Sequence, residues 1–427
     1  MKIDRIELNN FRKFEKASFE FPSNFTVLIG ENGKGKSSVL QAVRVAAATF
    51  LLGIDEVERY HIQKEDVRRI DAGNRFAPTT NCFFNASGMV NNEEVAWKRT
   101  LPRLGGKTDT KDANALISIA KSLNSAVNES LQNDVSLPVL CYFSTARLWS
   151  ESKQTFNLKK KGSKLKDGYI RCLEARNDKV SPMEWIKSAY WKKLKNKEEG
   201  VLFDAVLEAI DQCIPQWKPL EWDEDSDDLG GVFTDPEGQE SFIPLYYLSD
   251  GLRTMASMVA EIAYRCAVLN EHLGKDAIRE SRGVVLIDEI DMHLHPKWQQ
   301  GVVGDLKKAF PHIQFIATTH SPFIVQSLAA EELINLDAQV DEEPYKLSIQ
   351  EVASHIMKVE PRSLLYQQQY HKATDYFKTL EGLHDESEET INKTLAKIET
   401  EEAITDPAFA AFLKMNRLAK IESKKAK

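Results

Sequence analysis

Several features that would assign a chain to a particular class are missing from this sequence of 427 residues. No apolar run reaches the roughly 18 to 20 residues that cross a membrane, and no secretory signal is recognisable. The 5 cysteines are scattered and form no C-x-x-C pair, which is typical of reduced thiols rather than of a disulfide framework. These absences favour a cytoplasmic protein without a membrane partner.

An excess of basic residues is also missing, because the formal net charge is −8. Such a chain does not coat nucleic acid with its whole surface, although a local basic patch is enough for binding. Lysines gather between residues 153 and 197, with Trp185 and Trp191 among them. This basic segment is either a DNA-facing arm or a solvated lysine loop, and the sequence leaves both interpretations open.

A phosphate-binding motif is present near the amino terminus. Residues 30–37 read GENGKGKS and follow the apolar run 25–29, so a strand, a glycine-rich turn and a helix are expected in that order. Such a turn points backbone N–H groups and the helix dipole at a phosphate. In this pattern Lys36 reaches the β- and γ-phosphates and the Ser37 hydroxyl binds Mg²⁺. The motif predicts ATP and Mg²⁺ as cofactors.

A second motif ends in two carboxylates. Residues 283–291 read GVVLIDEID, a continuous apolar run of the kind found in a strand of a parallel sheet that is covered on both faces. Asp288 is then placed at the end of the strand to hold Mg²⁺, and Glu289 to orient or deprotonate the attacking water. In isolation the pair is equally compatible with surface charge after a buried strand. The phosphate-binding motif favours the catalytic interpretation.

The interpretation of two further segments depends on the phosphate-binding motif. Residues 248–253 read LSDGLR ahead of a periodic apolar stretch, which predicts a helix that begins near Ser249. An ordinary N-cap explains this pattern, but so does a second anion site that serves the γ-phosphate of a neighbouring subunit. Residues 313–322 read IQFIATTHSP, a buried strand followed by His320. That histidine is either a satisfied core residue or a donor to the γ-phosphate.

Together these motifs resemble the ATP-binding-cassette ATPases of the RecF-like and SMC-like group, whose first strand the opening IELNNFRKFEKASFEF also resembles. The resemblance implies a head-to-head dimer, with ATP held between the phosphate loop of one subunit and the signature loop of the other. It implies Glu289 as the catalytic base, His320 as the switch, and Ser37 with Asp288 as Mg²⁺ ligands. The implied nucleotide-binding residues are Arg12, Gly30, Asn32, Gly33, Gly35, Lys36, Ser37, Ser38, Gln63, Ser249, Asp250, Gly251 and Asp291.

Some of these assignments have alternatives. Arg12 also fits an exposed cation on an edge strand. Gln63 is the candidate for the glutamine that follows the phosphate loop in this group. Ser249 and Gly251 act in trans in the implied dimer, and Asp291 lies in the loop between subunits. His293 with His295 would be a weak metal-ligand pair, so a loop followed by a helix start is expected there.

The expected fold class is α/β, an ABC-type P-loop ATPase head with a mixed sheet flanked by helices, an inserted helical lid and a C-terminal helical module. The expected divisions are 1–150 for the N-terminal lobe, 151–244 for the inserted lid or arm, 245–348 for the second part of the head and 349–427 for the C-terminal module. No sustained heptads occur, so no coiled coil is expected. Other expected elements are strands at 81–86, 95–101 and 137–149, a helix at 112–131 and an acidic loop at 221–228. Arg147 is a candidate phosphate or inter-subunit contact.

The tail after His320 predicts a short strand region and several helices, without the catalytic cluster of the OLD-type nucleases. A compact head with no coiled coil and a helical tail resembles the Septu (PtuA) ATPase family of bacterial anti-phage systems. That family works with a separate HNH nuclease, which the tail would bind. The main alternative is a RecF-like DNA-repair ATPase that binds DNA without a nuclease partner, and another is a nucleotide sensor with little turnover.

Overall fold

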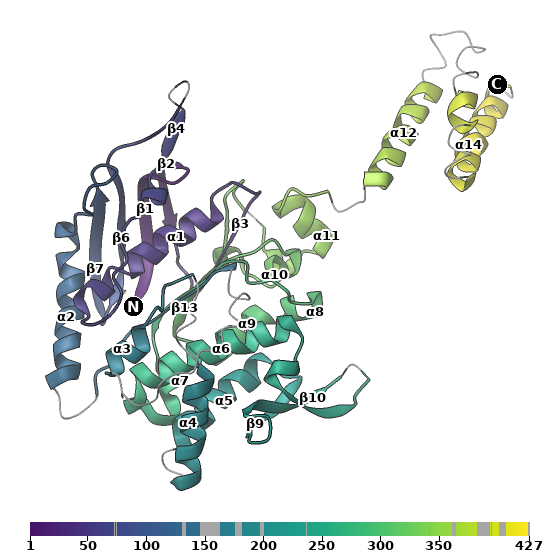
Figure 1. The fold of residues 1–427 in the computed structure, drawn as a ribbon. Helices are drawn as coiled ribbons and strands as arrows, with labels where there is room; N and C mark the ends of the chain where they lie inside the picture. The colour runs from purple at the N-terminus through teal and green to yellow at the C-terminus, as the bar shows by residue number, and fades with distance from the viewer. Residues whose placement is uncertain are drawn as a thin grey trace. The chain divides into compact units, whose positions relative to one another are not determined.

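The structure is a computed structural model that describes residues 1–71, 73, 75–129, 134–145, 163–175, 182–196, 200–235, 237–340, 342–360, 364–381, 393, 395–400 and 407–425. The chain divides into two compact units, Met1–Met357 and Lys358–Lys427, which we describe separately (Figure 1). Residues 349–357 therefore belong to the first unit. Arg147 lies outside the described residues.

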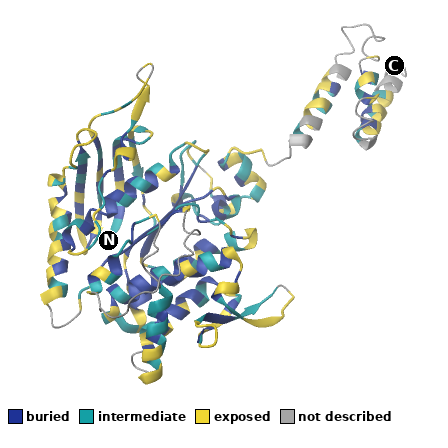
Figure 2. Cartoon of the chain, viewed as in Figure 1, coloured by how far each residue is buried: buried dark blue, intermediate teal, exposed yellow. Residues whose placement is uncertain are grey.

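A parallel sheet forms the centre of the first unit. Its order is β14 (Leu333–Asn335), β3 (Phe25–Ile29), β13 (Ile313–Thr318), β12 (Gly283–Ile287) and β8 (Val139–Phe143), and every neighbouring pair is parallel. All residues of β3, β12 and β13 are buried, as Figure 2 shows, which explains why these strands read as unbroken apolar runs. The strands expected at 25–29, 283–287 and 313–318 are thus confirmed, and with them the α/β fold class.

An antiparallel sheet lies beside this centre. Its order is β2 (Phe14–Glu20), β1 (Lys2–Phe11), β6 (Cys82–Val90) and β7 (Glu93–Leu101). Helix α1 (Lys36–Ala47) contacts β12 and β13 of the parallel sheet as well as β1 and β6 of this one. The two sheets are also joined by Gln314 of β13, whose buried amide donates to Ile3 O at 2.7 Å and accepts from Ile3 N at 2.8 Å.

Helices complete the first unit. The central one is α6 (Asp250–Leu269), which packs on β8 and contacts its helical neighbours α3, α4, α5 and α7. The remaining helices of this unit are α2 (Asn114–Glu129), α3 (Lys164–Tyr169), α4 (Pro182–Lys195), α5 (Val201–Cys213), α7 (Ala277–Glu280), α8 (Pro296–Gln299), α9 (Val302–Ala309), α10 (Pro322–Gln326) and α11 (Ile349–Glu351). The helix expected at 112–131 is confirmed as α2. All 5 cysteines are buried and free.

The acidic segment 221–228 departs from expectation. It is not simply a solvated loop, because residues up to Asp223 complete β9 (Trp217–Asp223) and Asp228 begins β10 (Asp228–Thr234). Together with β11 (Glu240–Pro244) these strands form a separate sheet, and Trp222 is buried in it. Leu220 and Trp222 alternate with acidic residues, as expected for a strand with one buried face. The high negative charge of the segment made this alternation easy to overlook. Strands β4 (Arg69–Asp71) and β5 (Phe76–Pro78) form a small hairpin.

The second unit contains helices α12 (Leu364–Glu381) and α14 (Pro407–Lys425), with a helical segment at 395–400. Its small core is made of Tyr376, Leu395 and Leu413. Buried polar contacts reinforce that core, since the Tyr376 hydroxyl donates to Glu399, which also binds Arg417 at 2.7 Å. In neither unit is a described helix long and apolar enough to span a membrane.

The Gln314 contact makes a testable prediction about stability. Gln314→Leu keeps the side-chain volume but leaves the N–H and C=O of Ile3 without their partners. Because each unpaired buried polar group costs about 1–3 kcal/mol, we expect the unfolding free energy to fall by about 2–5 kcal/mol in urea denaturation. The exposed Gln239→Leu is the matched control. Equal urea midpoints for the two variants would show that Gln314 does not join the sheets.

Candidate functional site

The site is built at one edge of the parallel sheet. Strand β13 lies between β3 and β12, and because all three run in the same direction their carboxyl ends meet. The loop 30–35 follows β3, Asp288 follows β12 and Thr319 follows β13. Three segments that are far apart in the chain are thereby brought to one place.

The phosphate loop adopts a backbone that only glycine takes easily. Gly33 and Gly35 have φ of 79° and 105°, in the left-handed region. A Cβ on Gly35 would lie 2.6 Å from the ring of Phe14, so the turn between β1 and β2 presses on the loop. Helix α1 begins at Lys36, and its free N–H groups face the loop. This cradle fits a phosphate group.

Lys36 lies inside that cradle. Its Nζ donates to Gly30 O at 2.6 Å and to Glu31 O at 3.2 Å, and the residue is buried. Burial lowers the pKa of Lys36 below its ordinary value, while the carboxylates of Asp337, Asp288 and Glu289 act against that shift. The ammonium is therefore held by the loop it serves, within reach of a phosphate bound there.

Hard oxygen ligands meet beside Lys36. The Ser37 hydroxyl donates to Asp288 Oδ1 at 3.3 Å, and the hydroxyl of buried Thr318 donates to the same oxygen at 2.6 Å. A serine hydroxyl and a carboxylate on neighbouring elements are the donor types that suit Mg²⁺ next to a phosphate. The residues present thus fit the metal that the motif predicts.

Glu289 is held in an unusual backbone conformation. Its φ of 52° lies in the left-handed region, which is uncommon for a residue with a side chain and tends to occur at functional sites. Thr318 fixes this turn twice, since its Oγ1 accepts from Glu289 N at 2.8 Å and its carbonyl accepts from Ile290 N at 3.0 Å. One threonine therefore sets the positions of both Asp288 and Glu289.

The loop that follows Glu289 connects the site to residues 248–253, the signature segment. Thr319 Oγ1 donates to Asp291 Oδ1 at 2.5 Å, which ties this loop to the end of β13. Gly251 packs directly on the same loop, because a Cβ there would lie 2.2 Å from His293 O. His295 caps α8 through Nδ1 and Pro296 opens it, which confirms the expected helix start. The residues that the structure describes contain no group of three metal-ligating side chains.

The other signature residues face solvent. Ser249 is exposed at the N-cap of α6, and Asp250 accepts from Arg253 at 2.8 Å. Among the described residues, no hydrogen bond or ion pair joins Ser249 to residues 30–38. The chain thus has a phosphate loop and an exposed signature segment that are not hydrogen-bonded to each other in the described part of one copy.

Arg12 and Gln63 lie on either side of a buried carboxylate. Arg12 Nε donates to Asp66 Oδ1 at 2.9 Å, and Gln63 N donates to Asp66 Oδ2 at 3.0 Å. Gln63 is exposed, and its side-chain amide donates to His61 O at 3.0 Å. Gln41 of α1 also donates to Asp66, at 3.4 Å, so Arg12 is linked to the helix that follows the phosphate loop.

The remaining candidates lie at the rim. Asn32 and His320 are exposed, and Ser38 is partly buried in the first turn of α1. His320 follows Thr319 directly, so it stands at the same edge of the sheet as the phosphate loop.

Three contacts at the phosphate loop were not predicted from the motifs. Lys13 Nζ donates to Gly33 O at 2.6 Å. Asp337, just after β14, accepts from Glu31 N at 2.6 Å and pairs with Lys34 at 2.7 Å. The hydrogen bond from Lys34 holds the pKa of Asp337 below its ordinary value. The sequence feature that could have predicted Asp337 is its position just after a short apolar run. Residues that follow the strands of a parallel sheet lie at the edge where ligands bind.

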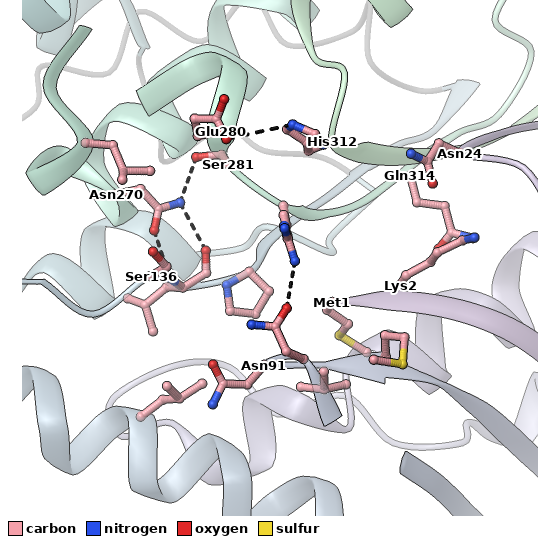
Figure 3. A pocket seen from close by; sticks show the side chains of 18 residues that line it. Met1, Lys2, Asn24, Asn91, Ser136, Asn270, Glu280, Ser281, His312 and Gln314 are labelled. Atoms are coloured by element: carbon pink, nitrogen blue, oxygen red, sulfur yellow. Dashed lines mark hydrogen bonds and ion pairs between the residues drawn. The ribbon is translucent and has the colours of Figure 1, made fainter. Parts of the chain in front are cut away.

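A separate cavity of about 560 Å³ lies elsewhere (Figure 3). It is lined by Asn24, Pro138, Arg282 and His312, which immediately precede β3, β8, β12 and β13. These are the amino ends of the parallel strands, so the cavity opens at the edge of the sheet opposite the phosphate loop. It is not the nucleotide site.

Thr318 allows a direct test of the site's geometry. Thr318→Val preserves shape but removes the donor to Asp288 and the acceptor for Glu289 N. We expect the ATP turnover predicted from the motifs to fall about 10- to 100-fold, with a weaker Mg²⁺ dependence, as is usual when the support of a metal ligand is lost. Steady-state kinetics over a Mg²⁺ series measures both.

Thr26→Val is the matched control, because Thr26 is equally buried in the neighbouring strand β3 and its hydroxyl has no hydrogen bond. Equal losses of turnover in the two variants would contradict a positioning role for Thr318.

Among solved structures, SMC head domains give partial matches to this chain. A SmcHead bound to the C-winged helix domain of ScpA matches 78% of this chain and 93% of that chain, with 16% identity and a TM-score of 0.45. The SMC head domain from Thermotoga maritima matches 78% and 94%, with 15% identity and a TM-score of 0.40.

Known sequences give similarities over a comparable share of the chain. The Retron Vc95 probable ATPase of Vibrio cholerae serotype O1 biovar El Tor is 27% identical over 395 residues, 78% of this chain and 73% of that protein. The Septu protein PtuA of Bacillus mycoides is 27% identical over 349 residues, 80% of this chain but 41% of that protein.

Family patterns account for most of the head. The family described as "AAA domain, putative AbiEii toxin, Type IV TA system" matches residues 148–326. The family described as "AAA domain" matches residues 5–218, half of the chain, and includes the phosphate loop. The chain therefore belongs to the AAA domain family.

Proposed function

We propose that the chain is the ATP-hydrolysing subunit of a bacterial anti-phage defence complex, in which two copies close around ATP and control a separate HNH nuclease. The observation that supports this most is the presence of two anion sites in one copy. Lys36 is held inside the phosphate loop 30–37, whereas Ser249 at the start of α6 is exposed and, among the described residues, shares no hydrogen bond or ion pair with that loop. The similarity to Septu and retron ATPases supports the defence setting.

The side chains at the edge of the sheet supply the hydrolytic chemistry. Lys36 and the N–H groups at the start of α1 bind the β- and γ-phosphates. Ser37 and Asp288 would hold Mg²⁺, which when bound neutralises charge on the phosphate oxygens. Glu289 accepts a proton from the attacking water, in an orientation fixed by Thr318.

The second copy completes the site in this arrangement. Ser249 and the amino terminus of α6 contribute donors to the γ-phosphate of the partner's nucleotide. Asp291 and its loop lie under Gly251, so the two loops that face the partner support each other within one copy. His320 stands at the sheet edge as a donor that senses the γ-phosphate.

The C-terminal unit is the proposed nuclease-docking module. It has its own core, yet Met415 and Leu418 of α14 are 72% and 47% exposed. Neighbouring apolar side chains on an exposed helix favour contact with another protein.

A RecF-like role on DNA is the alternative. Its candidate contact is the basic segment 153–197, of which residues 163–175 and 182–196 are described. In α4, Lys187 pairs with Asp227 at 2.6 Å and Lys193 with Asp204 at 2.5 Å. These ion pairs reduce the positive charge available to phosphates and favour the solvated interpretation.

Mixing two inactive variants tests the composite site. Ser249→Arg places bulk and charge where the partner's γ-phosphate would dock, and Lys36→Ala removes the phosphate-binding cation. Each alone should lose ATPase activity, while Ser249→Arg keeps nucleotide binding. An equimolar mixture should regain activity up to about a quarter of the wild-type rate, because half of the dimers are mixed and each has one intact site. Full activity of Ser249→Arg alone would rule out the arrangement.

Docking of the nuclease is tested on the exposed face of α14. Met415→Glu with Leu418→Glu, in the full chain, should abolish capture of the proposed HNH nuclease partner, because carboxylates cannot be desolvated in an apolar contact. ATP hydrolysis should be unchanged. Pull-down with tagged nuclease measures the first and phosphate release the second.

Lys414→Glu, at the exposed position immediately before Met415, is the control for added charge. Deletion of residues 360–427 should likewise remove capture and leave a folded ATP-binding head. Retention of the nuclease by the truncated chain would place the docking surface elsewhere.

A further inference from the structure

Two adjacent tyrosines stand out beside the signature segment. Tyr246 and Tyr247 are 67% and 72% exposed, and their rings lie perpendicular with centroids 5.5 Å apart. They end the short turn η6 (Leu245–Tyr247), two and three residues before Ser249. Single exposed aromatics are common, but a pair at the rim of a proposed nucleotide site calls for an explanation.

The turn that carries them is fixed. Leu245 and Leu248, on either side, are buried, and Leu248 N donates to Leu245 O at 3.2 Å. Tyr246 N donates to Asp228 Oδ2 at 2.9 Å, which anchors the turn to the start of β10. These contacts fix the backbone that holds both rings in solvent. Ordering the rings on ligand binding therefore costs little conformational entropy.

A cation completes this aromatic surface. The Arg253 guanidinium lies 5.9 Å from the centre of the Tyr246 ring and donates to Asp250 at 2.8 Å. Two π-faces next to a guanidinium are the combination that stacks planar bases. Both features adjoin Ser249, the residue proposed to face a partner's γ-phosphate.

We propose that Tyr246 and Tyr247 form a base-stacking subsite for the adenine of the ATP bound to the second copy. The inference rests on the proposed sandwich of two copies. Two or three residues of chain span at most about 7 to 10 Å, and each tyrosine ring extends beyond its backbone. With Ser249 at the γ-phosphate, the rings are within reach of the ribose and base of the same nucleotide.

The aromatic ring beside the phosphate loop is compatible with a stacking partner from the second copy. Phe14 is a ring that packs against the phosphate loop at Gly35, and it is engaged edge-on by Phe19 at 5.6 Å. Phe14 thus shapes the loop. An aromatic contribution from the partner copy would give the base a stacking surface, and it would make base recognition depend on closure of the dimer.

The variant mixture allows a test in which the two copies are distinguished. In a mixture of Ser249→Arg and Lys36→Ala chains, the one intact site combines the phosphate loop of the first chain with the signature side of the second. Tyr246→Ala with Tyr247→Ala added to the Lys36→Ala chain should raise the KM for ATP about 10-fold and change kcat little, because stacking acts on binding. Added to the Ser249→Arg chain, the same changes should have no effect.

Three further measurements sharpen the result. Phenylalanine at both positions should restore the KM, and Tyr345→Ala, which removes an exposed tyrosine elsewhere, is the matched control. Inhibition by inorganic tripolyphosphate, which has no base, should be equal with and without the tyrosines. Unchanged thermal midpoints check folding.

Other outcomes overturn the inference. If the mixture is active but the KM stays constant, or rises only when the tyrosines are lost from the Ser249→Arg chain, the base does not stack on them in trans. If the KM is constant and binding of single-stranded DNA weakens instead, the rings serve nucleic acid. If no mixture regains activity, the sandwich itself fails and the inference falls with it.

Discussion

The parallel pairing of β13 with both β3 and β12 is the constraint on which the site depends. Strands that run in one direction release their loops at one edge, so the phosphate loop, Asp288 and Thr319 meet without any long-range design of the loops themselves. Thr318, at the end of the middle strand, then hydrogen-bonds the carboxylate of Asp288 and the backbone of Glu289. The positions of these side chains are therefore set by the pairing of the strands in the sheet.

The same edge explains how two copies would communicate. Gly251 has no space for a side chain because the loop after Glu289 packs on it at His293. A shift of that loop on loss of a γ-phosphate would therefore press on the start of α6, the central helix of the head.

Sequence patterns predicted the parts of this site that depend on local chemistry. Lys36, Ser37 and Asp288 were predicted because the phosphate loop and the buried strand each have a characteristic spacing, and the structure brings these residues together. Asp337 and Lys13 were missed, since each reaches the loop only through tertiary packing. The acidic segment 221–228 was misread because charge obscured the alternation of buried Leu220 and Trp222.

The mass of the Glu289→Gln chain, with and without Mg²⁺ and ATP, tests the account most directly. This variant keeps the shape of the site but removes the proton acceptor, so it should bind ATP and remain closed. The account predicts that the mass doubles from 48.4 kDa when ATP is added, and that Lys36→Ala shows no such change. A mass that is the same with and without ATP, in a variant shown to bind the nucleotide, would contradict the sandwich of two copies.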